Sequence, residues 1–182
     1  QFAAIILERL LKIANVKLVV TQPVAETSAA LLAIQNNIPV LSPESISAIE
    51  SELKKIDSDL MVVADYGQII PMNILEIAKF GSINVHPSLL PKFRGPAPIQ
   101  QTILMNEKKT GTTLIKMDDK MDHGPIIAQT EYDLSGIEKY GELLIDLANS
   151  SANLLEKTLV PYLAGEIIPR DQDDSQASKH TF

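Results

Sequence analysis

The spacing of hydrophobic residues in the first half of the chain predicts helices and strands in alternation. Apolar residues recur at helical spacing over residues 2–14, with charged residues between them. Short runs rich in apolar and β-branched residues predict strands at 16–21, 60–64 and 82–86. Helices are expected between them, at 24–36, from a Ser-Pro-Glu start at 42–44 to about residue 56, and after Pro71. This alternation favours a Rossmann-like, doubly wound α/β fold with a mostly parallel sheet and helices on both faces.

The second half of the chain has a different pattern. Two strand-like runs, 110–117 and 125–134, are joined by the polar loop D-D-K-M-D-H-G, which predicts an antiparallel excursion from the sheet. Residues 138–163 carry apolar residues at helical spacing. Beyond Gly165 the composition turns polar. We therefore expect one globular domain over residues 1–165 and a solvated linker or tail over residues 166–182.

Composition narrows the function classes. The chain has 182 residues, 16 basic and 23 acidic side chains, a net charge of −7 and no cysteine. The missing thiols exclude disulfides, thiolate metal sites and cysteine nucleophiles, and they favour a reducing cytoplasm. No apolar run approaches the ~18 residues of a membrane span, so no membrane association is expected. The acidic balance argues against unaided binding of a polyanion, because phosphate neutralisation dominates nucleic-acid affinity.

The strand predicted at 82–86 carries the first candidate chemistry. Side chains two apart share one face of a strand, so Asn84 and His86 would project together, and Pro87 would end the strand. An amide beside an imidazole can stabilise a developing oxyanion and move a proton near neutral pH. The alternative is a structural histidine that hydrogen-bonds a backbone carbonyl at the strand end.

The polar loop at 118–124 and the turn after the strand are weaker candidates. Asp122 lies in an acidic run, and such runs are usually solvated surface. A metal site made of Asp118, Asp119, Asp122 and His123 has no recognised ligand spacing, so no metal is expected. Arg94 and Gly95 could bind an anion or could simply form a surface turn. The sequence contains no Gly-rich phosphate-binding motif.

Three segments together resemble the folate-dependent formyltransferases over nearly the whole chain. They are V-V-A-D-Y-G-Q-I-I-P at 62–71, N-V-H-P-S-L-L-P at 84–91 and T-G-T-T-L-I-K-M-D-D-K-M-D-H-G-P-I-I at 110–127. The motifs V-T-Q-P at 20–23 and R-G-P-A-P-I-Q at 94–100 favour the branch of the family that acts on initiator tRNA. The resemblance implies 10-formyltetrahydrofolate as formyl donor and the α-amino group of methionyl initiator tRNA as acceptor.

The resemblance also implies roles for particular residues. Asn84, His86 and Asp122 correspond to the catalytic residues of the family, with Asp122 orienting the imidazole. Arg94 and Gly95 are candidates for the acceptor side. The residues implied in folate binding are Tyr66, Gly67, Gln68, Ile69, Ile70, Pro71, Ser88, Leu89, Leu90, Pro91, Asp119, Lys120 and Met121.

The sequence departs from the family pattern in three places. It begins within the first helix, so we expect the first strand of the family fold to be absent from these residues. A basic loop after T-Q-P and the C-terminal tRNA-binding barrel are likewise expected to lie outside them. The resemblance further implies a monomer, cytoplasmic in a bacterium or organellar in a eukaryote. Alternative functions are formylation of a sugar-nucleotide or ribonucleotide amine, hydrolysis of formyltetrahydrofolate, and a catalytically silent folate-binding module.

Overall fold

The computed structural model describes residues 1–23 and 27–178. Its main sheet has the strand order β3-β4-β5-β6, and a separate two-stranded sheet pairs β1 with β2. The β1–β2 and β3–β4 pairs are parallel, and the β4–β5 and β5–β6 pairs are antiparallel. The strands are β1 (Val19–Val20), β2 (Val40–Leu41), β3 (Met61–Val63), β4 (Ser82–His86), β5 (Lys109–Lys116) and β6 (Ile126–Asp133). The α/β fold and the antiparallel excursion are confirmed.

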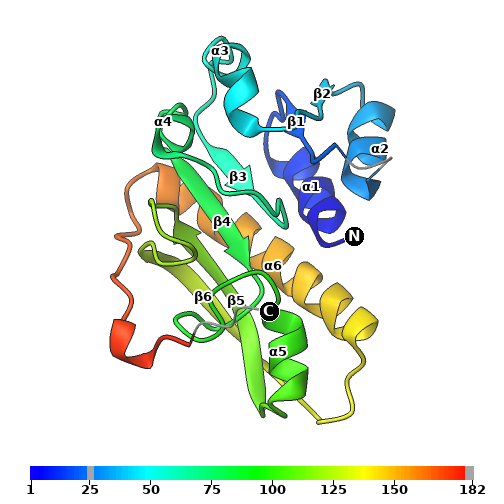
Figure 1. Ribbon diagram of the computed structural model, residues 1–182, viewed down its shortest axis with the longest axis vertical. Helices are drawn as coiled ribbons and strands as arrows, with labels where there is room; N and C mark the ends of the chain where they lie inside the picture. Colours follow the sequence, from blue (N-terminus) through cyan, green and yellow to red (C-terminus); the bar gives the residue numbers. More distant parts are fainter. Residues whose placement is uncertain (24–26, 179–182) are drawn as a thin grey trace.

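Helices cover both faces of the main sheet (Figure 1). On one face, α1 and the long α6 pack against Ile83, Val85 and Leu114 in a core that includes Leu155. On the other face, the short helices between β2 and β4 pack against Met61 and Val63. The helices are α1 (Phe2–Ile13), α2 (Ser28–Gln35), η1 (Ile46–Ile49), α3 (Glu50–Leu53), α4 (Met72–Leu75), α5 (Pro98–Leu104), α6 (Tyr140–Leu163) and η2 (Asp174–Gln176).

Two predicted helix starts need comment. The start predicted at residues 42–44 is wrong, and regular structure begins instead at Ile46, as a 3₁₀ turn. The Ser42 hydroxyl hydrogen-bonds the Thr21 hydroxyl at 2.8 Å, and the residue that precedes the 3₁₀ turn, Ser45, makes no side-chain capping bond. The helix predicted over 24–36 is described from Thr27, whose hydroxyl accepts from the Ala30 amide. Its expected first residues, 24–26, lie outside the described part of the chain.

The segment after α6 is anchored at several points, although much of it is exposed. Arg170 forms a backbone bridge with Ile126, and η2 follows. Ser178 then bonds to Pro91, Phe93 and Arg94. In Figure 1 this segment descends along the edge of the molecule and returns toward its centre. Residues 170–178 are therefore attached to the domain formed by residues 1–165. The sequence had instead suggested a solvated tail here.

Candidate active site

Strand β4 presents Asn84 and His86 on one face of the sheet. The intervening residues, Ile83 and Val85, are 2% and 1% exposed and pack into the core with α1 and α6. Alternation along the strand therefore directs Asn84 and His86 to the opposite face. His86 is itself only 4% exposed. The predicted strand matches the observed one residue for residue.

The carboxylate of Asp122 joins these two side chains. Asn84 Nδ2 donates to Asp122 Oδ1 at 2.9 Å, and the amide of Gly95 donates to Oδ2 at 2.8 Å. His86 Nδ1 lies 3.6 Å from the same Oδ2. Loop 117–125 thus brings Asp122 across 38 residues of sequence to Asn84. The three residues that the motifs suggested as catalytic meet in one cluster.

The second nitrogen of the imidazole is held by the backbone. His86 Nε2 lies 2.9 Å from the carbonyl oxygen of Phe93. A carbonyl can only accept, so this bond assigns a proton to Nε2. The structural alternative, a carbonyl-bound histidine at a strand end, is therefore realised at Nε2. It leaves Nδ1 as the nitrogen that faces Asp122.

Unusual backbone conformations shape the loops around the cluster. Phe93 and Asp122 adopt positive φ angles of 58° and 50°, in the region that costs a non-glycine residue energy. Gly124 is required for a different reason, because a Cβ there would lie 1.8 Å from the carbonyl oxygen of Lys116. The glycine of the D-H-G motif thus lets the Asp122 loop lie directly on the end of β5.

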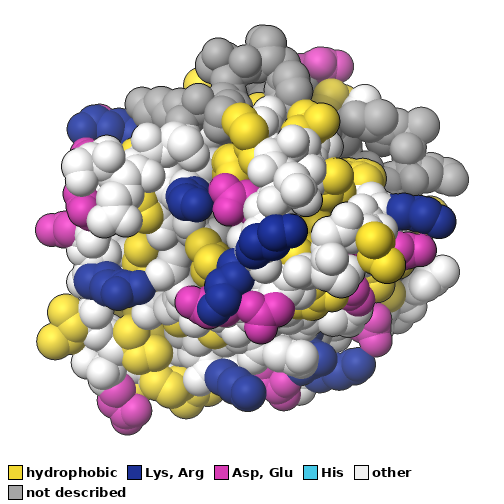
Figure 2. Space-filling view, turned by 90° about the horizontal axis from the view of Figure 1, so that it is seen from below, with side chains coloured by type: hydrophobic (Ala, Val, Ile, Leu, Met, Phe, Trp, Pro, Cys, Tyr) yellow, Lys and Arg dark blue, Asp and Glu magenta, His cyan; other side chains and the backbone are white. Residues whose placement is uncertain are grey.

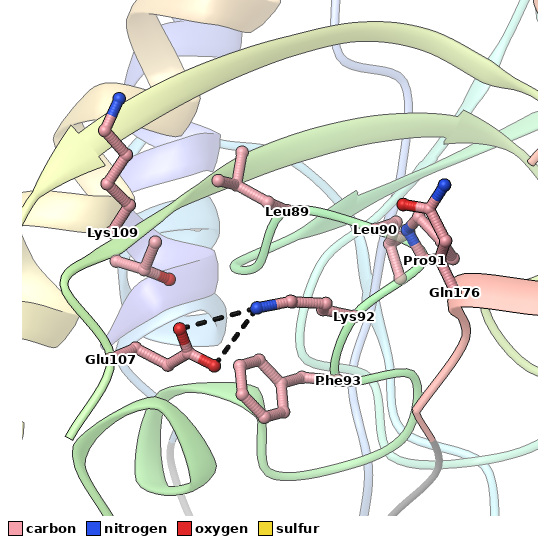
Figure 3. A pocket seen from close by; sticks show the side chains of 9 residues that line it. Leu89, Leu90, Pro91, Lys92, Phe93, Glu107, Lys109 and Gln176 are labelled. Carbon is pink, nitrogen blue, oxygen red and sulfur yellow. Dashed lines mark hydrogen bonds and ion pairs between the residues drawn. The ribbon is translucent and has the colours of Figure 1, made fainter. Parts of the chain in front are cut away.

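Residues 88–91, implied in folate binding, form a rigid turn after β4. Ser88 is fully buried and its hydroxyl donates to the Lys92 carbonyl at 2.7 Å. The Thr113 hydroxyl donates to the Ser88 carbonyl and accepts from the Leu90 amide. Leu90, Pro91 and their neighbour Leu89 line a cavity of about 250 Å³, spanned by the Lys92–Glu107 ion pair (Figure 3). The backbone of residues 88–91 is thus held by hydrogen bonds, while the side chains of Leu89, Leu90 and Pro91 line the cavity.

Residues 66–71, also implied in folate binding, follow β3. The register pairs Val63 with Asn84, so this loop leaves the sheet beside the end of β4. Ile69 is 81% exposed, whereas Ile70 is buried in the core below. The Tyr66 hydroxyl is buried and has no hydrogen-bond partner within the described residues. Burial also raises the pKa of Tyr66, so the hydroxyl stays a neutral donor.

The backbone of this loop is held by the T-Q-P segment. Gln22 Nε2 donates to the Tyr66 carbonyl, and Gly67 has a φ of 73° directly beneath the Gln22 amide. The Gln68 amide reaches the Glu44 carbonyl at 3.3 Å. Pro71 is the N-cap of α4. The residues of the third implied folate segment, Asp119, Lys120 and Met121, are all exposed.

Arg94 and Gly95 do not present an open anion site. The Arg94 side chain is buried and bonds to Gln172 and Asp174, so its guanidinium is already occupied. Gly95 acts through its amide, on the Asp122 carboxylate. The structure therefore places both residues in support of the cluster. The contacts of Gln172 and of the Phe93 carbonyl could not be predicted from sequence, because they depend on distant loops.

The described residues show neither a metal site nor a membrane-spanning helix. No group of three or more His, Asp or Glu side chains among them is placed to hold a metal ion. No helix in residues 1–23 and 27–178 is long and apolar enough to cross a membrane. On the face seen in Figure 2, Lys and Arg side chains are interspersed with Asp and Glu, so that face carries no uniform basic patch.

The fold and the cluster define a class: an α/β domain that holds an Asn–His–Asp cluster at the end of strand β4. The chain belongs to the formyl transferase family, whose model matches residues 7–159. The chain is 37% identical to the methionyl-tRNA formyltransferase of Hydrogenobaculum sp., with 98% of this chain and 62% of that protein covered. It is 42% identical to the methionyl-tRNA formyltransferase of Bacillus subtilis, with 80% of this chain and 47% of that protein covered.

Solved structures give the same fold. The phosphoribosylglycinamide formyltransferase of Bacillus halodurans superposes with a TM-score of 0.77 at 29% identity, covering 90% of this chain and 89% of that one. An N-formyltransferase from Helicobacter canadensis, solved with folinic acid and dTDP-3-aminofucose, gives 0.80 at 22% identity, covering 99% of this chain and 67% of that one. The chain spans about half to three fifths of the length of the curated relatives it matches.

Proposed function

We propose that this chain is the catalytic domain that transfers the formyl group of 10-formyltetrahydrofolate to the α-amino group of methionyl initiator tRNA. The observation that carries the proposal is the Asp122 carboxylate, which bonds Asn84 Nδ2 and faces His86 Nδ1. This arrangement sets hydrogen-bond donors and a proton acceptor around one point. Acyl transfer to an amine needs this combination.

The chemistry follows from the positions of the side chains. A neutral amine attacks the formyl carbon, its new C–N bond replaces the bond to N10 of the folate, and the formyl oxygen gains negative charge on the way. Asn84 Nδ2 is a donor that stabilises this charge, and His86 Nδ1 becomes a second donor when the imidazole carries protons on both nitrogens. Asp122 orients both side chains and accepts the proton of the amine through a water, and this proton passes to N10 as the bond between N10 and the formyl carbon breaks. Losing one such donor typically costs about 2.7 to 4 kcal/mol of transition-state stabilisation.

The donor pocket that we propose lies between the loops at 66–71, 88–91 and 119–121. The exposed side chains of Ile69 and Met121 offer apolar surface to a flat ring. The Tyr66 hydroxyl is closed to solvent and has no partner among the described residues, so a polar ligand atom would reach it only after the 66–71 loop shifts. These features support a folate. In this proposal the three loops would bind the folate, and 10-formyltetrahydrofolate would itself bring the reactive carbon.

The acceptor is proposed from sequence similarity. Identities of 37% and 42% join this chain to methionyl-tRNA formyltransferases, against 29% and 22% to the structures that act on a ribonucleotide or carry a sugar nucleotide. The proposal also includes the barrel domain and basic loop expected from the resemblance, as the parts that would hold the tRNA. We further propose that the catalytic domain ends near residue 165 and that the enzyme is cytoplasmic and monomeric.

A competition assay tests the function. The full-length gene product receives 10-formyltetrahydrofolate together with methionyl initiator tRNA, a dTDP-amino sugar and glycinamide ribonucleotide, and each formylated product is quantified. We expect formylmethionyl-tRNA to be the dominant product. Detection of a formylated sugar or ribonucleotide would support the proposed donor site but contradict the proposed acceptor. Free formate as the sole product would indicate a hydrolase.

A further inference from the structure

A single side chain outside the motifs, Gln172, connects the catalytic loop to a buried arginine. Its Nε2 donates to the carbonyl of Asp122 at 2.9 Å and to the carbonyl of Gly124 at 2.8 Å. Its Oε1 accepts from Arg94 Nε at 3.0 Å and from Nη2 at 2.8 Å. Both amide protons and the amide oxygen are therefore used, and contacts span 48 to 78 residues of sequence.

Gln172 is anchored on both sides along its own segment. Before it, the Arg170 backbone pairs with Ile126 at 2.7 and 2.9 Å. After it, Asp174 bonds Arg94 Nη2 at 2.8 Å, and Ser178 bonds the amides of Phe93 and Arg94. Such anchoring limits the rotamers and the backbone freedom of Gln172. Its amide is therefore held in place before any ligand binds.

The contacts of Gln172 bear on the two backbone segments that fix Asp122. Asp122 has a φ of 50°, a conformation that persists only when its surroundings impose it. Gly95, next to Arg94, donates its amide to the Asp122 carboxylate. Gln172 thus holds the Asp122 backbone from one side, and through Arg94 it holds the residue that bonds the Asp122 carboxylate from the other.

We propose that Gln172 is a positioning residue for formyl transfer, which sets the carboxylate of Asp122 against Asn84 and His86. The inference rests on the proposed function of that cluster. It makes the segment after α6 part of the catalytic unit. A displacement of the carboxylate by about 1 Å is enough to lower a rate about 100-fold.

Two substitutions separate this role from simple support of Arg94. Gln172→Ala removes all four hydrogen bonds. Gln172→Glu keeps an oxygen for the Arg94 guanidinium but replaces the donor that binds the Asp122 and Gly124 carbonyls with a second acceptor. Asp171→Asn is the matched control, because Asp171 is the exposed neighbour of Gln172 on the same segment. Rates are compared at a temperature at which circular dichroism shows every variant folded.

We expect Gln172→Glu and Gln172→Ala to lower kcat by about 10- to 100-fold with the KM for 10-formyltetrahydrofolate within about threefold, and Asp171→Asn to match the parent protein. A Gln172→Glu variant with parental kcat overturns the inference, even where Gln172→Ala is slow or unfolded, because Gln172 then only satisfies Arg94. Asp122→Asn is run in parallel. If that variant keeps parental turnover, the proposed function of the cluster fails; if it is slow while both Gln172 variants are normal, only the inference fails.

Discussion

His86 Nε2 donates a hydrogen bond to the carbonyl of Phe93 at 2.9 Å, and this bond decides which nitrogen of the imidazole takes part in chemistry. Phe93 has a positive φ and its amide is bonded to Ser178, so its carbonyl is firmly placed. Because Nε2 is bonded to the Phe93 carbonyl, Nδ1 is the nitrogen that can gain and lose a proton. Nδ1 lies 3.6 Å from Asp122 Oδ2.

The tautomer of His86 follows directly. In the neutral ring we expect the proton on Nε2, because the Phe93 carbonyl cannot donate one. Nitrogen-15 chemical shifts of the resting protein would check this, with His86→Ala used to assign the signal. A neutral ring protonated at Nδ1 would contradict the geometry.

Asp122→Asn tests the proton acceptor. The substitution keeps the shape of the side chain but sets an amide donor against either the Asn84 amide or the Gly95 amide, and it removes the base. We expect kcat to fall about 100-fold or more, in the range of general acid–base catalysis, with the folate KM little changed. Steady-state kinetics measure both, and Asp133→Asn, at an exposed strand end, is the control. A large loss of donor affinity at normal kcat would argue against this role.

Two glycines provide a matched test of the Asp122 loop. A Cβ on Gly124 would lie 1.8 Å from the Lys116 carbonyl oxygen, so Gly124→Ala must move the loop. We expect it to lower the free energy of unfolding by about 1 to 3 kcal/mol and to reduce turnover. Gly141, in the first turn of α6, has open space at the same point. Gly141→Ala should raise stability by about 0.5 to 1 kcal/mol with activity unchanged. Urea titrations measure the free energy of unfolding of both variants. Equal changes in the two would contradict the close contact between Gly124 and the Lys116 carbonyl.

Glu138 gives the stability a defined dependence on pH. Hydrogen bonds from the Ser135 hydroxyl and amide, and from the Gly136 amide, lower the pKa of Glu138 to about 2 from 4.5. The unfolded chain binds this proton more readily. The stabilisation is therefore complete above about pH 4.5 and is lost as the pH falls toward 2.

The comparison of Glu138→Gln with the parent protein isolates this effect. We expect the variant to have a lower Tm at pH 7 and the difference to shrink below pH 4.5. Thermal scans from pH 7 to pH 3 measure it. A difference in Tm that stays constant across this range would show that the carboxylate bonds do not form.

The sequence was most informative where local signals coincide. Strand β4 was predicted with its observed bounds because apolar residues alternate with polar ones and Pro87 ends the run. The same pattern placed Asn84 and His86 on one face. Prediction failed at residues 42–44, where the signals for a helix start were present but the Ser42 hydroxyl is bonded to Thr21, the residue that follows β1.

What sequence could not supply is the set of contacts between distant loops. Arg94 was expected to face a ligand or solvent, yet Gln172 and Asp174, about 80 residues away, bury its guanidinium. Hydrophobic periodicity carries no information about such pairings, and the polar composition after Gly165 suggested solvation. The contact of Asp122 with Asn84 could be inferred only from family resemblance.

The most direct test of the account is the single-turnover rate of formyl transfer to methionyl initiator tRNA, with 10-formyltetrahydrofolate at saturation, for Asn84→Ala and His86→Ala of the full-length gene product. Asn149→Ala, an exposed amide on α6, is the control. We expect rates at least about 100-fold below the parent for the first two variants and a parental rate for the control. Transfer at the parental rate by either Asn84→Ala or His86→Ala would contradict it.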